Sequence, residues 1–444
     1  MRVGAARPVG AGASVDTMAG VPAFERHTLS NGLRVLTAPM PQVQSVICFV
    51  MFAAGSRYET PETNGIAHFA EHMFFKGTKR RPTASDIGSE IDGIGGEFNA
   101  FTGKEYTGYY VRCAGEHRSI ALDVLVDMLR HSKFDPEEID REKGVIVEEM
   151  NMYFDTPRDY ISGVYDSLLY DDQPLGWDII GRKETVRAAT RDTFLGYIDQ
   201  WYKPSRMVVG VAGMIDGDLQ SEIERLLGDL EPADTGRPAD AAIQGNGQAR
   251  VKIHTKASDQ AHLCLGVPSY PLVHPDRYAL QVLATVLGTG MSSRLFTEVR
   301  ERRGLAYYIY AINHSYTDAG SLFSQAGVDI ERIDEAITTI VAELKKITDE
   351  SVPSDELEKA RNVAKGRFVL QTESPHGLIM FGLRRDILEG EVPEPEEILA
   401  GLDAVTAEDV QRVAQDVIGG HGLNLALIGP FEQDQQERFE KLLV

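Results

Sequence analysis

Short segments in which apolar and polar residues alternate lie near the start of each half of the chain. This two-residue periodicity is typical of half-buried strands, because successive side chains of a strand point to opposite faces of the sheet. Longer segments carry an apolar residue every three or four positions and predict amphipathic helices, as at 119–132 and 333–348. The predicted strands are GLRVLTAP (32–39) and SVICFVMFAA (45–54), then ARVKIHT (249–255) and AHLCLGVP (261–268). Hairpins and helices together indicate an α+β fold, with mainly antiparallel sheets packed against several helices.

The second half of the chain repeats the first at a shift of 215–216 residues. The segment MVVGVAGMID (207–216) falls on LNLALIGPFE (423–432), and both have the composition of buried strands. Downstream, IERLL (223–227) falls on FEKLL (439–443). A repeat of this kind predicts two homologous α+β domains that are related by an internal duplication.

The segment 231–249 lies between the two repeats and is rich in Pro, Gly, Ala and Asp, which is typical of an exposed linker. We therefore expect an N-terminal catalytic domain at 23–230 and a homologous C-terminal domain without the zinc motif at 250–444. The Gly/Ala-rich residues 1–22 lack the apolar stretch of a secretory signal, so we expect a disordered tail there. A transit-like presequence is the alternative.

Composition and charge restrict the partners of the chain. The 444 residues are 43% hydrophobic and 25% charged, as in an ordinary globular protein. The net charge of −22, from 45 basic and 67 acidic residues, repels phosphate backbones and anionic lipids, so nucleic acid and membrane surfaces are not expected partners. No apolar run approaches the roughly 20 residues that span a bilayer. Three scattered cysteines, Cys48, Cys113 and Cys264, favour a reducing compartment.

The sequence GIAHFAEHMFFKGT (65–78) contains two histidines four residues apart, with a glutamate directly before the second. Residues i and i+4 share one face of a helix, so His68 and His72 can bind one cation at the ~2.0–2.1 Å that zinc takes with nitrogen. Glu71 borders this face, where it could take a proton from a water that attacks a carbonyl and give it to the leaving amine. This spacing predicts a zinc-binding helix, with Glu71 as general base and then general acid.

A core helix that happens to carry polar residues is the alternative. At the shift of the repeat, the polar positions of the motif fall on Leu283, Val286 and Leu287 of the second half. A helix at this place in the fold therefore needs no polar residues. Polar groups without hydrogen-bond partners on a half-buried face would each cost about 1–3 kcal/mol. This comparison favours the metal site.

A catalytic zinc usually has three protein ligands and one open position, so a third ligand is needed. Candidates lie in PEEIDREKGVIVEEMNMYF (136–154), which has helical periodicity. Glu142 and Glu149 stand seven residues apart, which is two turns along one face. We expect Glu149 to be the third ligand and Glu142 to orient a histidine or the water. A plain surface position for Glu142 stays open.

With these motifs the sequence resembles the pitrilysin/insulinase family of zinc metallopeptidases, the inverzincins, whose signature is H-x-x-E-H. In that family the third ligand is a glutamate at a fixed spacing after the second histidine, and the segment 73–148 between His72 and Glu149 has the length of that spacing. The family's additional acidic residue, seven positions earlier, matches Glu142. The resemblance covers about residues 24–444 and is closest to the short-chain branch, with the mitochondrial processing peptidase catalytic subunit and its bacterial relatives.

The resemblance implies further site residues. GGEFNAFTGKEYTGYY (95–110) is similar to the family's edge strand, which places Asn99, Ala100 and Phe101 against a peptide that adds as a strand. GTGMSSRLFTEVRERRGLAYYIY (288–310) is similar to the second-domain motif, in which Arg300 and Tyr307 would contact the substrate backbone and the carbonyl oxygen that becomes anionic. Local alternatives stay open, with Asn99 as a turn residue and the other pair in a solvated basic helix end.

The resemblance also implies partners and a location. Two chains of that branch form a clam-like chamber, in which Arg300 and Tyr307 would act on the zinc of the partner chain. We expect one Zn²⁺ per chain and a homodimer, with a heterodimer containing a zinc-free paralogue as the alternative. A bacterial-type chain is expected in the cytoplasm, ahead of the mitochondrial matrix.

The expected function is therefore that of a zinc endopeptidase that hydrolyses peptides or extended protein segments. The acidic balance favours basic, presequence-like peptides. A zinc-free subunit such as the core proteins of the respiratory complex, which share this fold, would have a damaged H-x-x-E-H or no Glu149, and neither is the case. A different zinc hydrolase, the third possibility, would need neither a dimer nor the Arg300 and Tyr307 pair.

Overall fold

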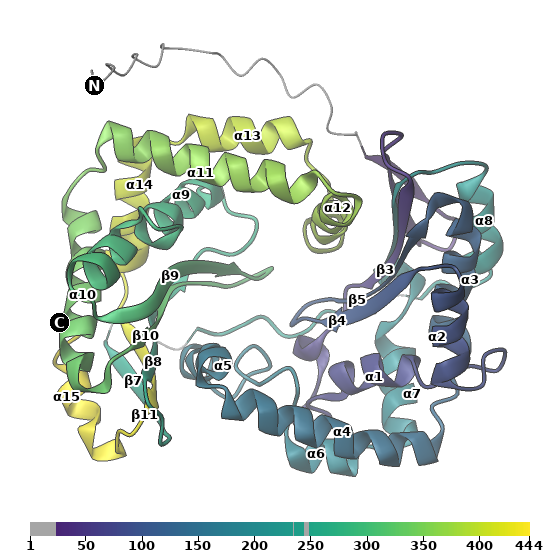
Figure 1. Ribbon diagram of the computed structural model, residues 1–444, viewed down its shortest axis with the longest axis horizontal. Coiled ribbons are helices and arrows are strands. Elements are labelled where there is room, and N and C mark those ends of the chain that lie inside the picture. The colour runs from purple at the N-terminus through teal and green to yellow at the C-terminus, as the bar shows by residue number, and fades with distance from the viewer. Residues whose placement is uncertain (1–23, 234, 244–247) are drawn as a thin grey trace, which may run out of the picture.

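The computed structural model describes residues 24–233, 235–243 and 248–444, so the tail predicted at 1–22 lies outside the described residues. The described chain forms two mixed sheets with helices packed against them (Figure 1). The α+β fold with two domains is thus confirmed. No helix in the described ranges is both long and apolar enough to cross a membrane.

The first sheet has the strand order β1-β2-β6-β3-β5-β4, and only β2 and β6 pair in parallel. Its strands are β1 (Glu25–Thr28), β2 (Arg34–Pro39), β3 (Ser45–Phe52), β4 (Glu97–Thr102), β5 (Thr107–Ala114) and β6 (Met207–Gly213). The helices of this half are α1 (Ile66–Phe74), α2 (Ala84–Gly93), α3 (Arg118–His131), α4 (Pro136–Asp155), α5 (Pro157–Leu169), α6 (Lys183–Ala188), α7 (Arg191–Trp201) and α8 (Leu219–Leu227).

The second sheet has the strand order β7-β11-β8-β10-β9, with β7 and β11 parallel. Its strands are β7 (Arg250–Thr255), β8 (Ala261–Ser269), β9 (Ala306–Ser315), β10 (Gly320–Val328) and β11 (Asn424–Gly429). The helices are α9 (Arg277–Gly288), α10 (Ile333–Asp349), α11 (Ser354–Thr372), α12 (Pro375–Glu389), α13 (Pro395–Ala404), α14 (Ala407–Ala414) and α15 (Gln436–Glu440), with a π-helical segment η4 at Phe296–Arg302.

The two sheets are built alike. Strands β2, β6, β3, β5 and β4 follow one another across the first sheet as β7, β11, β8, β10 and β9 do across the second. In both sheets the parallel pair joins the first of these strands to the last strand of that half. Strand β2 begins at Arg34 and β7 at Arg250, so their starts are related by the shift that the sequence predicts. The internal duplication is therefore confirmed by the topology.

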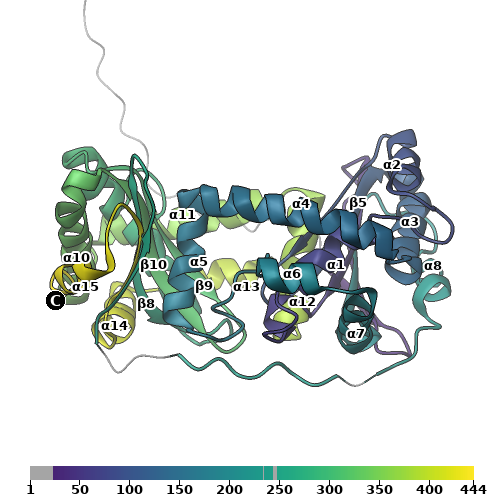
Figure 2. The same cartoon turned by 90° about the horizontal axis from the view of Figure 1, so that it is seen from below.

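One helix of each half packs against the sheet of the other half. Helix α4 runs from the first half towards the second, and α5 follows it and lies against the second sheet (Figure 2). Tyr165 of α5, for example, packs against Phe323 of β10 and is fully buried. In the opposite direction, Ile379 and Leu383 of α12 pack on the first sheet. A Cβ atom on Gly210 of β6 would lie 2.8 Å from both, so glycine lets the helix approach the strand.

Polar contacts fix the two halves to each other at two further places. Asp386 of α12 is buried and accepts hydrogen bonds from the guanidinium groups of Arg26 and Arg34 in the first half. At the tips of the β4–β5 and β9–β10 hairpins, the backbone N–H of Thr317 donates to Glu105 at 3.0 Å. Arg57 joins Glu105 to Asp318 of the second hairpin. The free edge strands β4 and β9 therefore extend towards each other at the centre of the molecule (Figure 1).

Candidate metal centre

Helix α1 carries the H-x-x-E-H motif, and a buried carboxylate holds its N-terminus. Glu59 accepts hydrogen bonds from the backbone N–H groups of Gly65 and Ala67, at 2.8 Å each. Burial raises the pKa of Glu59 to about 8, although these hydrogen bonds act in the opposite direction. Gly65 has a φ of 95°, and a Cβ atom there would lie 2.8 Å from the carbonyl oxygen of Ile180, so the sharp entry into the helix requires glycine.

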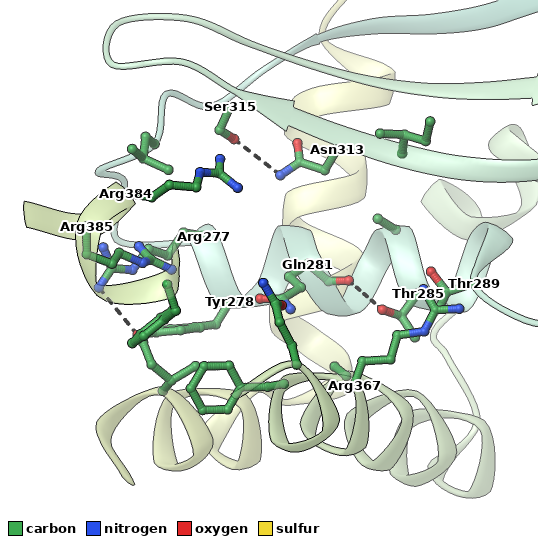
Figure 3. Close-up of a pocket in the computed structure, with 18 of the residues that line it drawn as sticks. Arg277, Tyr278, Gln281, Thr285, Thr289, Asn313, Ser315, Arg367, Arg384 and Arg385 are labelled. Atoms are coloured by element: carbon green, nitrogen blue, oxygen red, sulfur yellow. Dashed lines mark hydrogen bonds between the residues drawn. The ribbon is translucent and has the colours of Figure 1, made fainter. Parts of the chain in front are cut away.

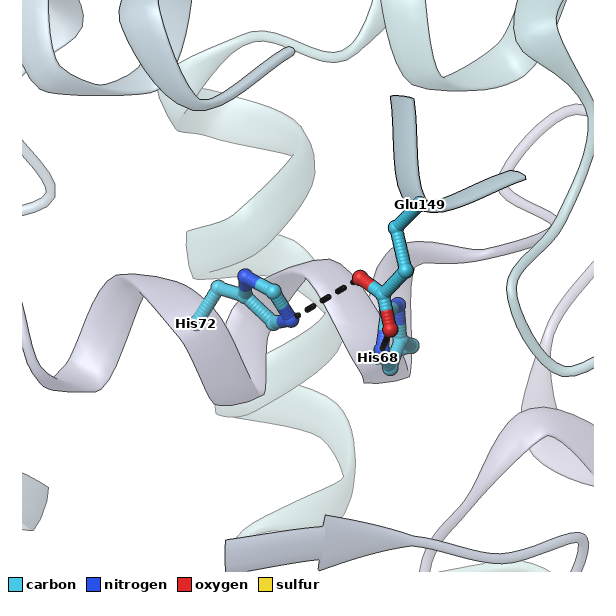
Figure 4. Close-up of side chains that lie close together, drawn as sticks. All are labelled: His68, His72 and Glu149. Atoms are coloured by element: carbon cyan, nitrogen blue, oxygen red, sulfur yellow. Dashed lines mark ion pairs between the residues drawn. The ribbon is translucent and has the colours of Figure 1, made fainter. Parts of the chain in front are cut away.

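The structure brings the three expected zinc ligands together. His68 and His72 project from α1 towards Glu149 of α4 (Figure 4). The Nε2 atom of His68 lies 3.6 Å from Oε1 of Glu149, and Nε2 of His72 lies 3.5 Å from Oε2. One ligand atom from each residue lies within 4.8 Å of the other two.

These distances fit a shared metal ion better than hydrogen bonds. They exceed the length of an N–H···O bond, which is about 2.7–3.2 Å. Two donor atoms that each lie about 2.05 Å from one tetrahedral ion are separated by about 3.3 Å. The spacing of the imidazole and carboxylate atoms is close to that value, and two nitrogens with one carboxylate is a usual donor set for catalytic zinc. The residues present therefore fit the ion.

Glu142 lies behind His72, on the side away from Glu149. Its Oε1 atom is 2.9 Å from Nδ1 of His72, and its Oε2 atom is 2.5 Å from Nζ of Lys76. Burial alone would raise the pKa of Glu142, but the contacts with His72 and Lys76 outweigh it and lower the pKa. Burial likewise acts to lower the pKa of His72, but the hydrogen bond with Glu142 and the charges of Glu149, Glu142 and Glu71 together outweigh it and raise the pKa. Glu142 is 4% exposed, so the alternative of a plain surface position is wrong.

Glu71 is hydrogen-bonded to the edge strand β4. The hydroxyl of Thr102, the last residue of β4, donates a hydrogen bond of 2.6 Å to Oε2 of Glu71. This contact orients the Glu71 carboxylate and connects α1 with the strand expected to bind a peptide. Thr102 could not be recognised from the sequence, because a single threonine at the end of a strand carries no signal of its own.

Asn99, Ala100 and Phe101 lie in β4, which is the edge strand of the first sheet. Strand β4 pairs with β5 on one side, and the other side pairs with no described strand. The backbone N–H of Ala100 donates to the side-chain oxygen of Asn99 at 2.8 Å. Asn99 is exposed and therefore supplies this backbone group with an acceptor that an added strand could replace.

Arg300 and Tyr307 lie together, but away from the three ligand residues. Arg300 is in η4 and Tyr307 near the start of β9, with the guanidinium 5.8 Å from the centre of the Tyr307 ring. Tyr307 is 72% exposed. Within the described residues, no hydrogen bond or ion pair joins either side chain to α1 or Glu149.

Helix α9 is the counterpart of α1, but the two helices align at a shift of 213 residues, two fewer than the 215 at which the pairing with β6 and β11 places Met51 of β3 on Gly266 of β8. In this alignment buried residues coincide along the whole helix, and Gly77 coincides with Gly290, both with positive φ. The matching buried residues are Ile66 with Ala279, Ala67 with Leu280, Phe69 with Val282, Ala70 with Leu283, Met73 with Val286 and Phe74 with Leu287. The two strands before these helices match at the predicted shift, so the connection into α9 is two residues shorter.

The positions of His68, Glu71 and His72 therefore fall on Gln281, Ala284 and Thr285. The expectation that aliphatic core residues occupy these positions in the second half is wrong, because a uniform shift cannot follow a shortened connection. Gln281 and Thr285 are polar and lie on the side of α9 that lines a cavity. The metal site is supported instead by the three donors that meet in the first half.

A duplicated α+β fold with an H-x-x-E-H helix and a glutamate on the neighbouring helix defines a metal-dependent hydrolase. Two family models match the chain, insulinase (peptidase family M16) at residues 34–183 and the peptidase M16 inactive domain at 188–364. The chain is 38% identical to the Bacillus subtilis protein named uncharacterized zinc protease YmxG, covering 92% of this chain and 98% of the relative. It is 35% identical to an uncharacterized zinc protease of Streptomyces coelicolor, covering 94% and 92%.

Solved structures have the same fold. A protease from Helicobacter pylori superposes with a TM-score of 0.86 at 22% identity, covering 93% of this chain and all of that one. A peptidase M16 inactive domain from Pseudomonas fluorescens superposes with a TM-score of 0.84 at 17% identity, covering 92% and 98%. The chain belongs to the insulinase family, peptidase family M16, and is a zinc protease of that family.

Proposed function

We propose that this chain hydrolyses peptides or extended protein segments with one zinc ion per chain, held by His68, His72 and Glu149. The convergence of these three donors beside Glu71 is the observation that carries the proposal. Zinc, when bound there, polarises the scissile carbonyl and makes a water molecule acidic enough to attack near neutral pH.

The chain's own residues move the protons. Glu71 accepts a proton from the attacking water and passes it to the leaving amine, while Thr102 holds its carboxylate in place. Glu142 accepts the Nδ1–H of His72, which leaves the Nε2 lone pair of the same ring as the donor that would hold the ion.

The substrate binds as an added strand beside β4. Its backbone would replace the Asn99 side chain at the N–H of Ala100, and Phe101 would border its side chains. The net charge of −22 favours basic, presequence-like peptides, and equal cleavage rates for an Arg-rich and an Asp-rich peptide would contradict that preference.

We also propose a homodimer whose two chains enclose the substrate, with a zinc-free paralogue as the alternative partner. The exposure of Tyr307 beside Arg300 supports it, because the pair is free to approach the site of a second chain. We propose the cytoplasm as the location of the protein. We further propose domain limits at 23–230 and 250–444, joined by the linker 231–249.

The test is hydrolysis of an internally quenched basic peptide by the purified chain, with its zinc content measured. Glu71→Gln is expected to abolish hydrolysis while zinc stays bound, and Ala284→Ser, at the matching position of α9, is expected to change neither. A chain that binds no zinc would overturn the proposal.

A complementation experiment tests the dimer. Glu71→Gln and Tyr307→Phe chains are each expected to be inactive alone. If Tyr307 serves the partner's site, each mixed dimer has one intact site, and random mixing restores about a quarter of the parent activity. No recovery after verified exchange of subunits would contradict the shared site.

A further inference from the structure

A cavity of about 550 Å³ lies in the second half, between α9, β9, α11 and α12 (Figure 3). The charged residues that line it are Arg277, Arg367, Arg384, Arg385 and Glu389. Four arginines around one carboxylate give this place an excess of positive charge, in a chain whose net charge is −22.

The cavity is the second-half counterpart of the candidate zinc site, because corresponding elements supply the residues of both. Helix α11 corresponds to α4, and the Thr-Pro start of α5 (156–157), which follows α4, matches the Ser-Pro start of α12 (374–375), which follows α11. In this alignment the buried residues coincide as well, Ile139 with Leu357, Glu142 with Ala360, Ile146 with Ala364 and Met150 with Phe368. The ligand Glu149 is then replaced by Arg367.

The edge strands correspond in the same way. The pairing of β4 with β5 and of β9 with β10 places Ala100, Phe101 and Thr102 on Ala311, Ile312 and Asn313. These three residues of β9 line the cavity, together with Gln281 and Thr285 of α9. The elements that line the cavity therefore correspond to those around the candidate zinc site, and Arg367 takes the position of the carboxylate Glu149.

Two of the four arginines are free to bind a ligand. Arg277 and Arg385 are paired with Glu389. Arg367 and Arg384 are exposed and, among the described residues, have no carboxylate within 4 Å. Arg384 also lies 5.4 Å from the centre of the Tyr106 ring in the first half, so the cavity borders the junction of the two halves.

We propose that this cavity binds carboxylate groups, and that their source is an acidic side chain or the C-terminal carboxylate of a peptide held by the protease. Guanidinium groups match carboxylates in shape and can donate two parallel hydrogen bonds. The peptide as source rests on the proposed function, whereas the anion site itself does not. A basic peptide also carries a C-terminal carboxylate, so this local site is compatible with the preference expected from the net charge. A peptide anchored here binds more tightly without any change in the chemistry at Glu71.

Binding without turnover tests the site independently of hydrolysis. Fluorescence anisotropy of a labelled peptide is measured on the Glu71→Gln chain, for one neutral host sequence with either three Asp or three Asn residues. Each is made with a free and with an amidated C-terminus, and citrate is the competing free polycarboxylate. Hydrolysis of the neutral peptide by the parent chain reports separately on the proposed function.

Charge reversal at Arg367 is compared with the same change at Arg225, which is exposed on α8 of the first half and has no ion-pair partner in the described chain. We expect the Asp peptide to bind about tenfold more tightly than the Asn peptide. Arg367→Glu should remove this preference and the competition by citrate, and Arg225→Glu should keep both. Arg367→Gln, with its thermal unfolding measured, serves as the second variant in case Arg367→Glu does not fold.

Each other outcome overturns part or all of the proposal. Equal losses in Arg367→Glu and Arg225→Glu would reduce the effect to net charge and overturn the site. Citrate binding that depends on Arg367, without a preference for Asp or for a free C-terminus, would keep the site and overturn the peptide as its source. No Arg367-dependent binding of any probe would overturn both.

Discussion

The candidate zinc site and the arginine-lined cavity lie at corresponding places in the two halves. At each place a helix, an edge strand and a second helix come together, and the two sheets behind them have the same strand order. Four positions change the chemistry, His68 to Gln281, Glu71 to Ala284, His72 to Thr285 and Glu149 to Arg367. The comparison shows that the duplicated fold supplies the framework, while a few side chains decide whether a metal or an anion suits it.

The largest effect is expected when a proposed metal ligand is replaced by the residue at the matching position of the second half. Glu149→Arg puts a cation where zinc needs an anionic donor, and we expect zinc to be lost and kcat/KM to fall by more than about 10³-fold. Metal analysis and peptide hydrolysis measure both. The reciprocal change Arg367→Glu is the control and should create no zinc site, because α9 offers no imidazole. Zinc retained by Glu149→Arg would count against the ligand assignment.

The candidate zinc site and the cavity also differ at Glu142, which contacts the ligand residue His72 and has Ala360 as its counterpart. Glu142→Gln keeps the shape of the side chain but weakens its hydrogen bond with Nδ1 of His72, so zinc affinity should fall about 10–100-fold. Competition with a chelator measures the affinity. Glu148→Gln is the matched control, because Glu148 is exposed on the same helix, and it should bind zinc like the parent. Equal affinities of the two variants would show that Glu142 does not support the ligand.

Helices α5 and α12, each packed on the sheet of the other half, are held by different forces, and stability measurements can separate these. Asp386 of α12 has a fully buried side chain paired with two arginines, one of them 41% exposed. Asp386→Ala should lower the free energy of unfolding by about 2 kcal/mol, less than a fully buried pair because of that exposure. Lys252→Ala removes a polar contact of α5 with the second sheet and should cost less than about 1 kcal/mol. Denaturant unfolding decides, and the reverse order would contradict this difference.

The smallest expected effect concerns the starts of the two equivalent helices. Glu59 caps α1 from a buried position, whereas Asp276 makes no side-chain cap at α9. The pKa of Glu59 is raised from 4.5 to about 8, so between these values the folded chain keeps a proton that the unfolded chain has released. Stability therefore falls as the pH rises through this window.

Glu59→Gln should make that fall less steep. Asp166, whose pKa burial raises to about 7, acts in the same direction and leaves part of the slope in the variant. Thermal unfolding of both chains at several pH values from 5 to 8 gives the two slopes. Identical slopes would mean that Glu59 stays ionised throughout.

Local spacing predicted which side chains share a face, because helix geometry alone places His68 beside His72 and Glu142 on the face of Glu149. The binding of zinc by these residues stays a prediction. The duplication and the strands that open each half also followed from the pattern of apolar segments, whereas the strand order became known only from the structure. The hydrogen bond between Thr102 and Glu71 could not be predicted, since it joins a helix to a strand 31 residues away. The shortened connection before α9 could not be predicted either, and it misaligned α1 with α9, so the correspondence of the cavity with the zinc site was not visible in the sequence. The roles of Arg300 and Tyr307 stay predictions, because they involve a second chain.

The exchange of α5 and α12 makes each half incomplete by itself. A fragment that ends at the linker would leave the face of its sheet that α12 covers open to water, and the remaining fragment would lack α5 in the same way. We therefore expect that neither half alone folds as stably as the two together. A single cut in the linker, by contrast, should leave two fragments that remain associated, since their joint core does not depend on the peptide bond between them.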